Sequence, residues 1–163
     1  MEEVKKKSET LTRNEVIRSK AVKIGKTSGH EYWIVPSPSG GLNGYVVFSK
    51  KPVLEEDSGG ILAYVPVHWG ITYAEHDKKI GSVYGFDTSH CDSEQFPIRH
   101  IDWIESQIKI MLKGILKAKQ VERKYLRCLT NKGKGKYVNQ VSNVCPKQWQ
   151  NMGTMLHMLS GKL

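Results

Sequence analysis

The spacing of apolar residues changes near residue 98, and this change most constrains the fold. Before it, short runs of β-branched and aromatic residues are separated by turns rich in glycine and proline, which is typical of strands. After it, from Ile98 to about Leu129, apolar residues recur every three or four positions with lysine and glutamine between them. That spacing predicts one long amphipathic helix. The sequence therefore predicts an α+β fold: a mainly antiparallel four-stranded sheet packed against one long helix, with short terminal helices.

Four strands are expected before the helix, in two hairpins. Gly29 to Pro36 and Gly44 to Ser49 are joined by a turn with the sequence S-P-S-G-G-L-N. Proline donates no hydrogen bond to a neighbouring strand, so Pro36 and Pro38 favour an edge position for the first of these strands. The second hairpin comprises Ile61 to Ala74 and Ile80 to Phe86, because their short connection is too small for a parallel crossover.

The length of 163 residues fits a single core domain with flanking segments. Residues 1–24 are charged, and a short helix from Asn14 to Val22 is expected there, capped by Thr10 or Thr12. Residues 25–129 form the predicted core domain. Residues 130–163 form a basic loop and a helical extension whose apolar side must be covered by this domain or by a second copy, so a homodimer is one expectation.

Composition excludes several classes of protein. The apolar fraction of 39% is too high for a wholly disordered chain. No apolar run approaches the length of about 20 residues that a membrane-spanning helix needs, and the N-terminus lacks the apolar stretch of a secretory signal. The three cysteines show no C-x-x-C spacing, so neither a disulfide framework nor a cysteine-rich zinc site is indicated. We expect a cytoplasmic protein.

The net charge of +9 is concentrated late in the chain. Between Lys113 and Lys136 there are nine cations against one acid, Glu122. Such a run can release counterions from nucleic acid or attract small anions, and it can also be the solvated face of a helix followed by a loop. The candidate nucleic-acid-binding residues are Lys117, Lys119, Arg123, Lys124, Arg127, Lys132 and Lys134.

Two histidines about twenty residues apart mark the best candidate site. His68 lies in V-P-V-H-W-G-I-T-Y-A and His90 in V-Y-G-F-D-T-S-H-C-D, both in strand-like sequence with polar neighbours. Strand alternation would place Val67, Trp69 and Ile71 on one face and His68, Gly70 and Thr72 on the other. Polar groups at strand ends are where ligands tend to bind, so the two histidines are expected to line one cavity if the register allows.

These motifs resemble a family of small uncharacterised proteins found widely in phage and prophage genomes. The likeness covers roughly residues 29–118 and consists of G-Y-V at Gly44, an acidic loop, V-H-x-G-I-T-Y from Val67, G-F-D-x-x-H from Gly85, and then an amphipathic helix. In that family the first motif usually reads V-H-G-G, where this chain has Trp69, and the second often reads G-F-D-C-A-H. The resemblance implies a phage context, and therefore the cytoplasm of a host cell, together with a site at the two motifs but without a reaction.

Four interpretations of the motif residues remain open. His68 can be a hydrogen-bonded structural histidine while Asp87 caps a turn. A divalent metal ion can be held by His68, Asp87, His90 and Asp92 and activate water. His68 and His90 can be the catalytic acid and base of a phosphoesterase, although the usual H-x-T or H-x-S motif is absent. A nucleotide-like ligand can be bound without turnover by the residues His68, Trp69, Thr72, Asp87, Ser89 and His90.

From these alternatives the sequence favours a phage-type, non-catalytic protein that sequesters an anionic, nucleotide-like signal of host defence. A small phosphoester hydrolase is the second hypothesis, so enzymatic activity is left open. The third is an inhibitor directed at nucleic acid or a host defence protein through its basic C-terminal arm.

Overall fold

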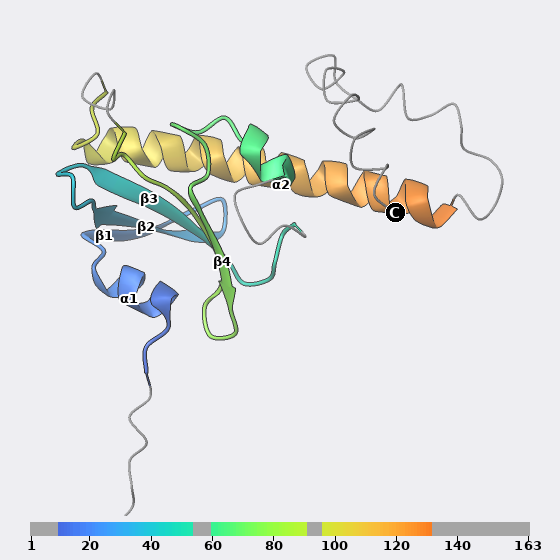
Figure 1. Ribbon diagram of the computed structural model, residues 1–163, viewed down its shortest axis with the longest axis horizontal. Coiled ribbons are helices and arrows are strands. Elements are labelled where there is room, and N and C mark those ends of the chain that lie inside the picture. The colour runs from blue at the N-terminus through green and yellow to red at the C-terminus, as the bar shows by residue number, and fades with distance from the viewer. Residues whose placement is uncertain (1–9, 54–59, 91–95, 132–163) are drawn as a thin grey trace, which may run out of the picture. The chain divides into compact units, whose positions relative to one another are not determined.

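The computed structural model describes residues 10–53, 60–90 and 96–131 (Figure 1). It confirms the α+β class, with one antiparallel sheet, one long helix and one short helix. The chain divides into two compact units between Glu122 and Arg123. The extension expected at 130–163 lies almost wholly outside the described residues. In chain order the elements are α1 (Arg13–Ser19), β1 (Lys23–Thr27), β2 (His30–Pro36), β3 (Leu42–Phe48), the 3₁₀ helix η1 (Gly60–Tyr64), β4 (Tyr73–Asp77), β5 (Gly81–Phe86) and α2 (Ile101–Asn131).

In the described part of the chain the sheet has five strands in the order β1-β2-β3-β5-β4, so the prediction of four strands was one short. All neighbours are antiparallel, and the predicted hairpin β2–β3 is present. The second hairpin, β4–β5, has the predicted second strand, but its first strand overlaps the predicted one only at Tyr73 and Ala74. The edge position predicted for the first hairpin strand is wrong, because β1 pairs along β2 from Lys23 to Thr27. Pro36 is tolerated in an inner strand because it lies beyond the last residue of β2 that pairs with β1, which is Ile34.

The strand predicted for Ile61 to Ala74 is mostly wrong. Its first part is η1, the middle is a turn from Val67 to Gly70, and only Tyr73 onward pairs in the sheet as β4. Pro66 and the left-handed backbone of Trp69 and Gly70 explain the interruption, because neither is compatible with a continuous strand. The alternation expected for residues 67–72 is therefore wrong as well: Val67 and Ile71 are buried, whereas Trp69 is exposed.

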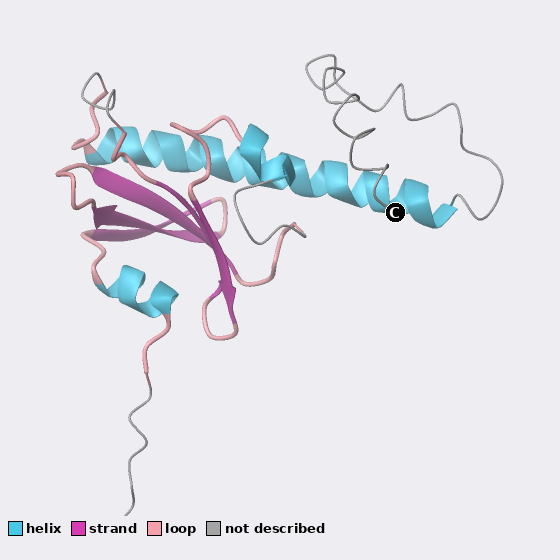
Figure 2. Ribbon diagram, in the orientation of Figure 1, coloured by secondary structure: helices cyan, strands magenta, loops and turns pink. Residues whose placement is uncertain are grey.

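Side chains alternate across the sheet and supply two separate cores. In Figure 2 the long helix α2 and the short helix α1 lie on opposite sides of the sheet. The larger core joins the sheet to η1, the following segment and α2, and it contains Ile34, Phe48 and Phe86 among its buried side chains. On the opposite face, Trp33 and Val83 pack with Ile17 and Ala21 from the region of α1. The packing on both faces of the sheet holds the ends of the strands in place, and the candidate site lies at one of these ends.

Both helices form largely where the sequence predicts them. Thr12 is the N-cap of α1, and a reciprocal bond between Thr12 and Glu15 completes a capping box. The apolar stripe of α2 is buried at Ile104, Ile108, Met111 and Ile115, as the spacing predicted. None of the helices in the described part of the chain combines the length and apolarity that crossing a bilayer requires.

Candidate ligand-binding site

A tight turn places an aromatic side chain in solvent at the first motif. The Gly70 N–H donates to the Val67 carbonyl at 2.8 Å, which closes the turn. Trp69 occupies its third position with φ +56°, a left-handed conformation normally reserved for glycine or asparagine. Its side chain is 54% exposed. Trp69 thus combines a strained backbone with an exposed indole, and each of these is unfavourable for a purely structural residue.

The indole of Trp69 joins the two motif histidines into one aromatic surface. It stacks on the His90 ring with centroids 4.9 Å apart and an interplanar angle of 30°. The His68 ring lies edge-on to the same indole, with the two ring centroids 6.5 Å apart. Both predicted histidines therefore belong to one cluster. The arrangement differs from two imidazoles facing each other, because each ring contacts Trp69.

His68 is further enclosed by two aromatic rings that the sequence did not connect with it. The ring centroids lie 4.8 Å from Phe96 and 5.1 Å from Trp103, which is in the first turn of α2. The His68 backbone N–H donates to the Gln107 side chain at 3.1 Å, also on α2. The helix thus anchors the turn that carries Trp69. Phe96 is 43% exposed and extends the aromatic surface.

The second motif leaves β5 and is tied back to the first by hydrogen bonds. The Asp87 N–H donates to the Thr72 hydroxyl at 3.1 Å, and the Thr72 N–H donates to the Gly85 carbonyl at 2.9 Å. Asp87 Oδ1 accepts from the Ser89 N–H at 2.9 Å and lies 3.4 Å from His90 Nε2. The last contact has ion-pair distance without hydrogen-bond geometry, since His90 Nε2 is buried without a hydrogen-bond partner among the described residues.

Three serine hydroxyls meet beside this segment. Ser37 Oγ lies 2.8 Å from Ser39 Oγ and 2.8 Å from Ser89 Oγ, and the latter two are 2.9 Å apart. Ser37 and Ser39 belong to the β2–β3 turn, whose serines the sequence indicated only as turn residues. The Leu42 N–H donates to the Ile98 carbonyl at 2.9 Å, which brings the segment before α2 to the same place.

The structure therefore gathers the predicted ligand-binding residues at one end of the sheet: His68, Trp69, Thr72, Asp87, Ser89 and His90. Asp92, a candidate metal ligand, lies outside the described residues. Among those described, no group of three or more histidine, cysteine, aspartate or glutamate residues is placed to hold a metal ion. Sequence reasoning missed Ser37, Ser39, Phe96, Arg99 and Trp103 as neighbours of the site.

The basic run is helical as far as it is described. Lys117, Arg123, Lys124 and Arg127 are exposed on α2 and Lys119 is half-buried. Lys132 and Lys134 lie outside the described residues. These side chains are far along the sequence of α2 from Trp103, so the basic run and the aromatic surface are separate features of the helix.

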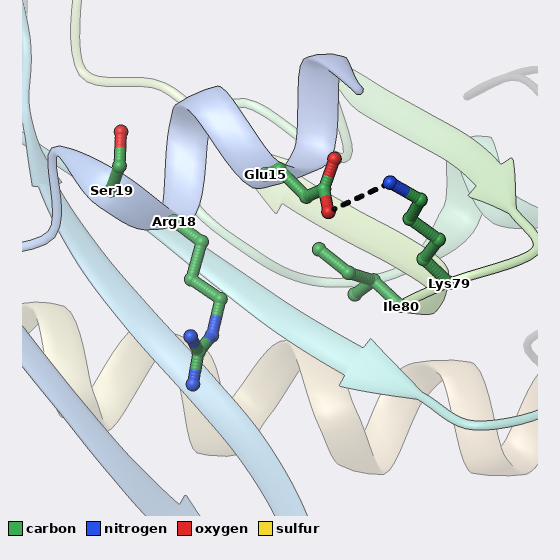
Figure 3. A pocket seen from close by; sticks show the side chains of 5 residues that line it. All are labelled: Glu15, Arg18, Ser19, Lys79 and Ile80. Carbon is green, nitrogen blue, oxygen red and sulfur yellow. Dashed lines mark ion pairs between the residues drawn. The ribbon is translucent and has the colours of Figure 1, made fainter. Parts of the chain in front are cut away.

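A shallow hollow between α1 and the β4–β5 turn is lined by Glu15, Arg18, Ser19, Lys79 and Ile80 (Figure 3). Its charges are already paired: Glu15 with Lys79 at 3.5 Å and Arg18 with Glu31 at 3.0 Å. Hydrogen bonding to the Thr12 N–H lowers the pKa of Glu15, which keeps that carboxylate ionised. Because these groups satisfy one another, the hollow serves the packing of α1 and is the weaker candidate site.

Fold and geometry together define a class: an antiparallel α+β domain with an aromatic and hydroxyl-rich surface at one end of its sheet. No protein-family model, curated protein or solved structure matches the chain significantly. The function must therefore be argued from the site itself.

Proposed function

We propose that the chain is a phage-type binding protein that captures a nucleotide-like anionic small molecule, such as a host-defence signal, and returns it unchanged. The observation that carries this proposal is Trp69, which is exposed, left-handed and stacked on His90. A left-handed backbone at a non-glycine residue costs roughly 1–3 kcal/mol, and such outliers concentrate at ligand sites. Stacking of a base on an aromatic side chain recovers a similar amount, about 1–3 kcal/mol.

Charge supports an anionic ligand. The net charge of +9 raises the local concentration of anions around the molecule. At the site, Arg99 is exposed in the segment that leads into α2. Its guanidinium lies close to Gly40, which follows Ser39 in the β2–β3 turn, so a phosphorylated base with its ring on Trp69 can direct its charge toward Arg99.

The rings around His68 favour binding over two-histidine catalysis. His68 contacts Phe96 and Trp103, and His90 Nε2 faces Asp87. A general acid and base must reach opposite sides of one phosphoester, whereas these two imidazoles contact Trp69 and other protein groups. A metal-assisted or two-histidine hydrolase is the alternative that the experiment below separates.

Thermal melting with a panel of cyclic and ADP-ribose-type nucleotides tests the proposal. At a ligand concentration about 100 times Kd, binding stabilises the folded state by about 2.7 kcal/mol, which raises the melting temperature by several degrees. We expect Trp69→Gly to stay folded, because glycine accepts φ +56°, and to lose the shift. Ile24→Ala, which truncates an exposed apolar side chain on β1, should keep it.

If the melting temperature stayed unchanged with every member of the panel, the proposal would be contradicted. After incubation and denaturation, chromatography should recover the ligand intact. A ligand returned in cleaved form would instead identify a hydrolase.

A further inference from the structure

The three serine hydroxyls form a closed triangle at the rim of the aromatic surface. Every edge of the triangle is between 2.8 and 2.9 Å, and two of its three edges join Ser89 to serines fifty or more positions earlier in the sequence. Ser37 is buried, whereas Ser39 and Ser89 are exposed. A hydroxyl carries one donor and two acceptor sites, so in a triangle each O–H can satisfy a neighbour. Rotation about the Cβ–Oγ bonds can also turn the donors of the exposed members outward without moving an oxygen.

A cation lies against the same turn. Gly40 has φ +88°, and Arg99 Nη2 would be 3.6 Å from a Cβ placed there, so the guanidinium sits directly beside the glycine. Arg99 itself is exposed. Guanidinium groups bind phosphate through paired, charge-assisted hydrogen bonds. Within the described part of this segment, the Asp87 carboxylate already accepts from the Ser89 N–H through Oδ1 and faces His90.

The adjoining segment, Thr88 to His90, carries buried polar atoms that make no hydrogen bond within the described residues. Among the described residues, two buried side-chain polar atoms lack a hydrogen-bond partner, Thr88 Oγ1 and His90 Nε2, and they flank Ser89 on either side. Thr88 Oγ1 occupies the space where a Cβ of Gly41 would lie, which holds the turn against the segment. Buried polar groups without a hydrogen-bond partner destabilise a fold, and native chains tolerate them mainly at functional sites.

We infer that Ser37, Ser39, Ser89 and Arg99 form an oxyanion subsite that receives the phosphoryl group of the ligand whose base stacks on Trp69. The inference rests on the proposed function for the identity of that ligand. Its position follows from the chain: Ser89 precedes His90, and the His90 ring stacks on Trp69. The exposed hydroxyls donate to the phosphoryl oxygens, and Arg99 supplies the balancing charge.

The test is a titration of the full chain with inorganic phosphate at constant ionic strength, followed by ¹H–¹⁵N spectra. We expect phosphate, and not chloride, to move the amide signals of Ser39, Gly40 and Ser89. The double variant Ser39→Ala/Ser89→Ala should lose these movements. The matched control Ser19→Ala/Ser49→Ala, which removes two exposed hydroxyls elsewhere, should retain them.

A second titration compares adenosine with adenosine monophosphate. We expect the monophosphate to bind the unmodified chain about tenfold more tightly, corresponding to about 1.4 kcal/mol. This preference should fall to near one in Ser39→Ala/Ser89→Ala, while both ligands still move the indole N–H signal of Trp69.

The two proposals fail in different ways. If phosphate leaves the Ser39, Gly40 and Ser89 amides unmoved while adenosine still moves the Trp69 indole signal, the subsite is refuted and the stacking function stands. If phosphate moves those amides but no nucleoside or nucleotide affects Trp69, the subsite stands and the nucleotide-binding function is overturned.

Discussion

Tyr32 illustrates how single residues on the α2 face of the sheet are fixed by polar partners. Its side chain is buried, and its hydroxyl donates to Glu105 on α2. Lys23 on β1 lies 2.6 Å from the same carboxylate. Burial, followed by the hydrogen bond to Glu105 and its charge, raises the pKa of Tyr32 to about 12. The residue thus links β1, β2 and α2 in its protonated form.

This pKa predicts alkaline destabilisation that depends on one hydroxyl. Between pH 10 and 12 a tyrosine in the unfolded chain ionises while folded Tyr32 stays protonated, so the free energy of unfolding falls as the pH rises. For Tyr32→Phe we expect a loss of about 1 kcal/mol at pH 8, from the missing hydrogen bond, and a shallower decline above pH 10. Urea unfolding from pH 8 to 12 measures both the loss at pH 8 and the slope above pH 10. If the free energy of unfolding declined equally steeply with pH in Tyr32→Phe and in the unmodified chain, the role assigned to the Tyr32 hydroxyl would be contradicted.

The residues of the site were only partly predictable. His68, Thr72, Asp87 and His90 could be found because polar side chains interrupt strand-like sequence. The part played by Ser37 and Ser39 could not, since a serine in a proline- and glycine-rich turn is what turn formation alone requires. Their contact with Ser89 spans 52 and 50 residues and exists only after β2, β3 and β5 have paired.

At the scale of elements, the sequence predicted the helices and strands whose apolar residues recur at regular spacing. It missed the strand that forms mainly because it pairs with a neighbouring strand. α2 and the β2–β3 hairpin have that regular spacing, whereas most of β4, with the sequence Y-A-E-H-D, lay outside the predicted strand. β1 was missed because K-I-G-K-T offers only Ile24 as a large apolar residue, and that side chain is 46% exposed. Its pairing with β2 forms the strand, and Gly25 leaves the space that the Tyr32 ring fills.

Gly114 shows why a residue that weakens a helix is retained inside one. Glycine weakens a helix interior, yet α2 runs through Gly114 without a break. A Cβ at Gly114 would lie 2.6 Å from Val65 Cγ1 and 3.2 Å from Pro66 Cδ. The missing side chain therefore lets the segment before the Trp69 turn approach the helix backbone closely.

Gly114→Ala is consequently expected to destabilise the fold. Alanine raises intrinsic helix propensity by about 1 kcal/mol, but overpacking against Val65 costs typically 1–3 kcal/mol, so the net effect should be a loss of order 1 kcal/mol. Lys113→Ala, at the exposed neighbouring position, places an alanine on α2 without crowding a neighbour and should be nearly neutral, because lysine and alanine have similar helix propensities. Urea unfolding of the two variants measures the difference. Equal or increased stability of Gly114→Ala would show that the close approach is not required.

At the scale of the whole molecule, the uneven charge predicts a second, weaker interaction that does not involve the aromatic surface. Five candidate cations lie on the described part of α2, and four of these are exposed. A basic helix face attracts polyanions through counterion release, irrespective of sequence. We therefore expect the full chain to bind short duplex DNA weakly at low salt.

This interaction should be separable from nucleotide binding by charge alone. For Arg123→Gln/Lys124→Gln we expect weaker DNA binding and a salt dependence of log K reduced by up to about 1.8, because each phosphate contact contributes about 0.9. Nucleotide-induced melting shifts should be unchanged, since both substituted residues are exposed on α2 about twenty positions beyond Trp103. Fluorescence anisotropy at 50 to 200 mM salt measures the first effect. If these substitutions abolished nucleotide binding as well, the basic helix rather than the Trp69 surface would hold the anion. If the chain instead bound DNA with sequence specificity and without salt dependence, it would have to be reconsidered as an inhibitor directed at nucleic acid.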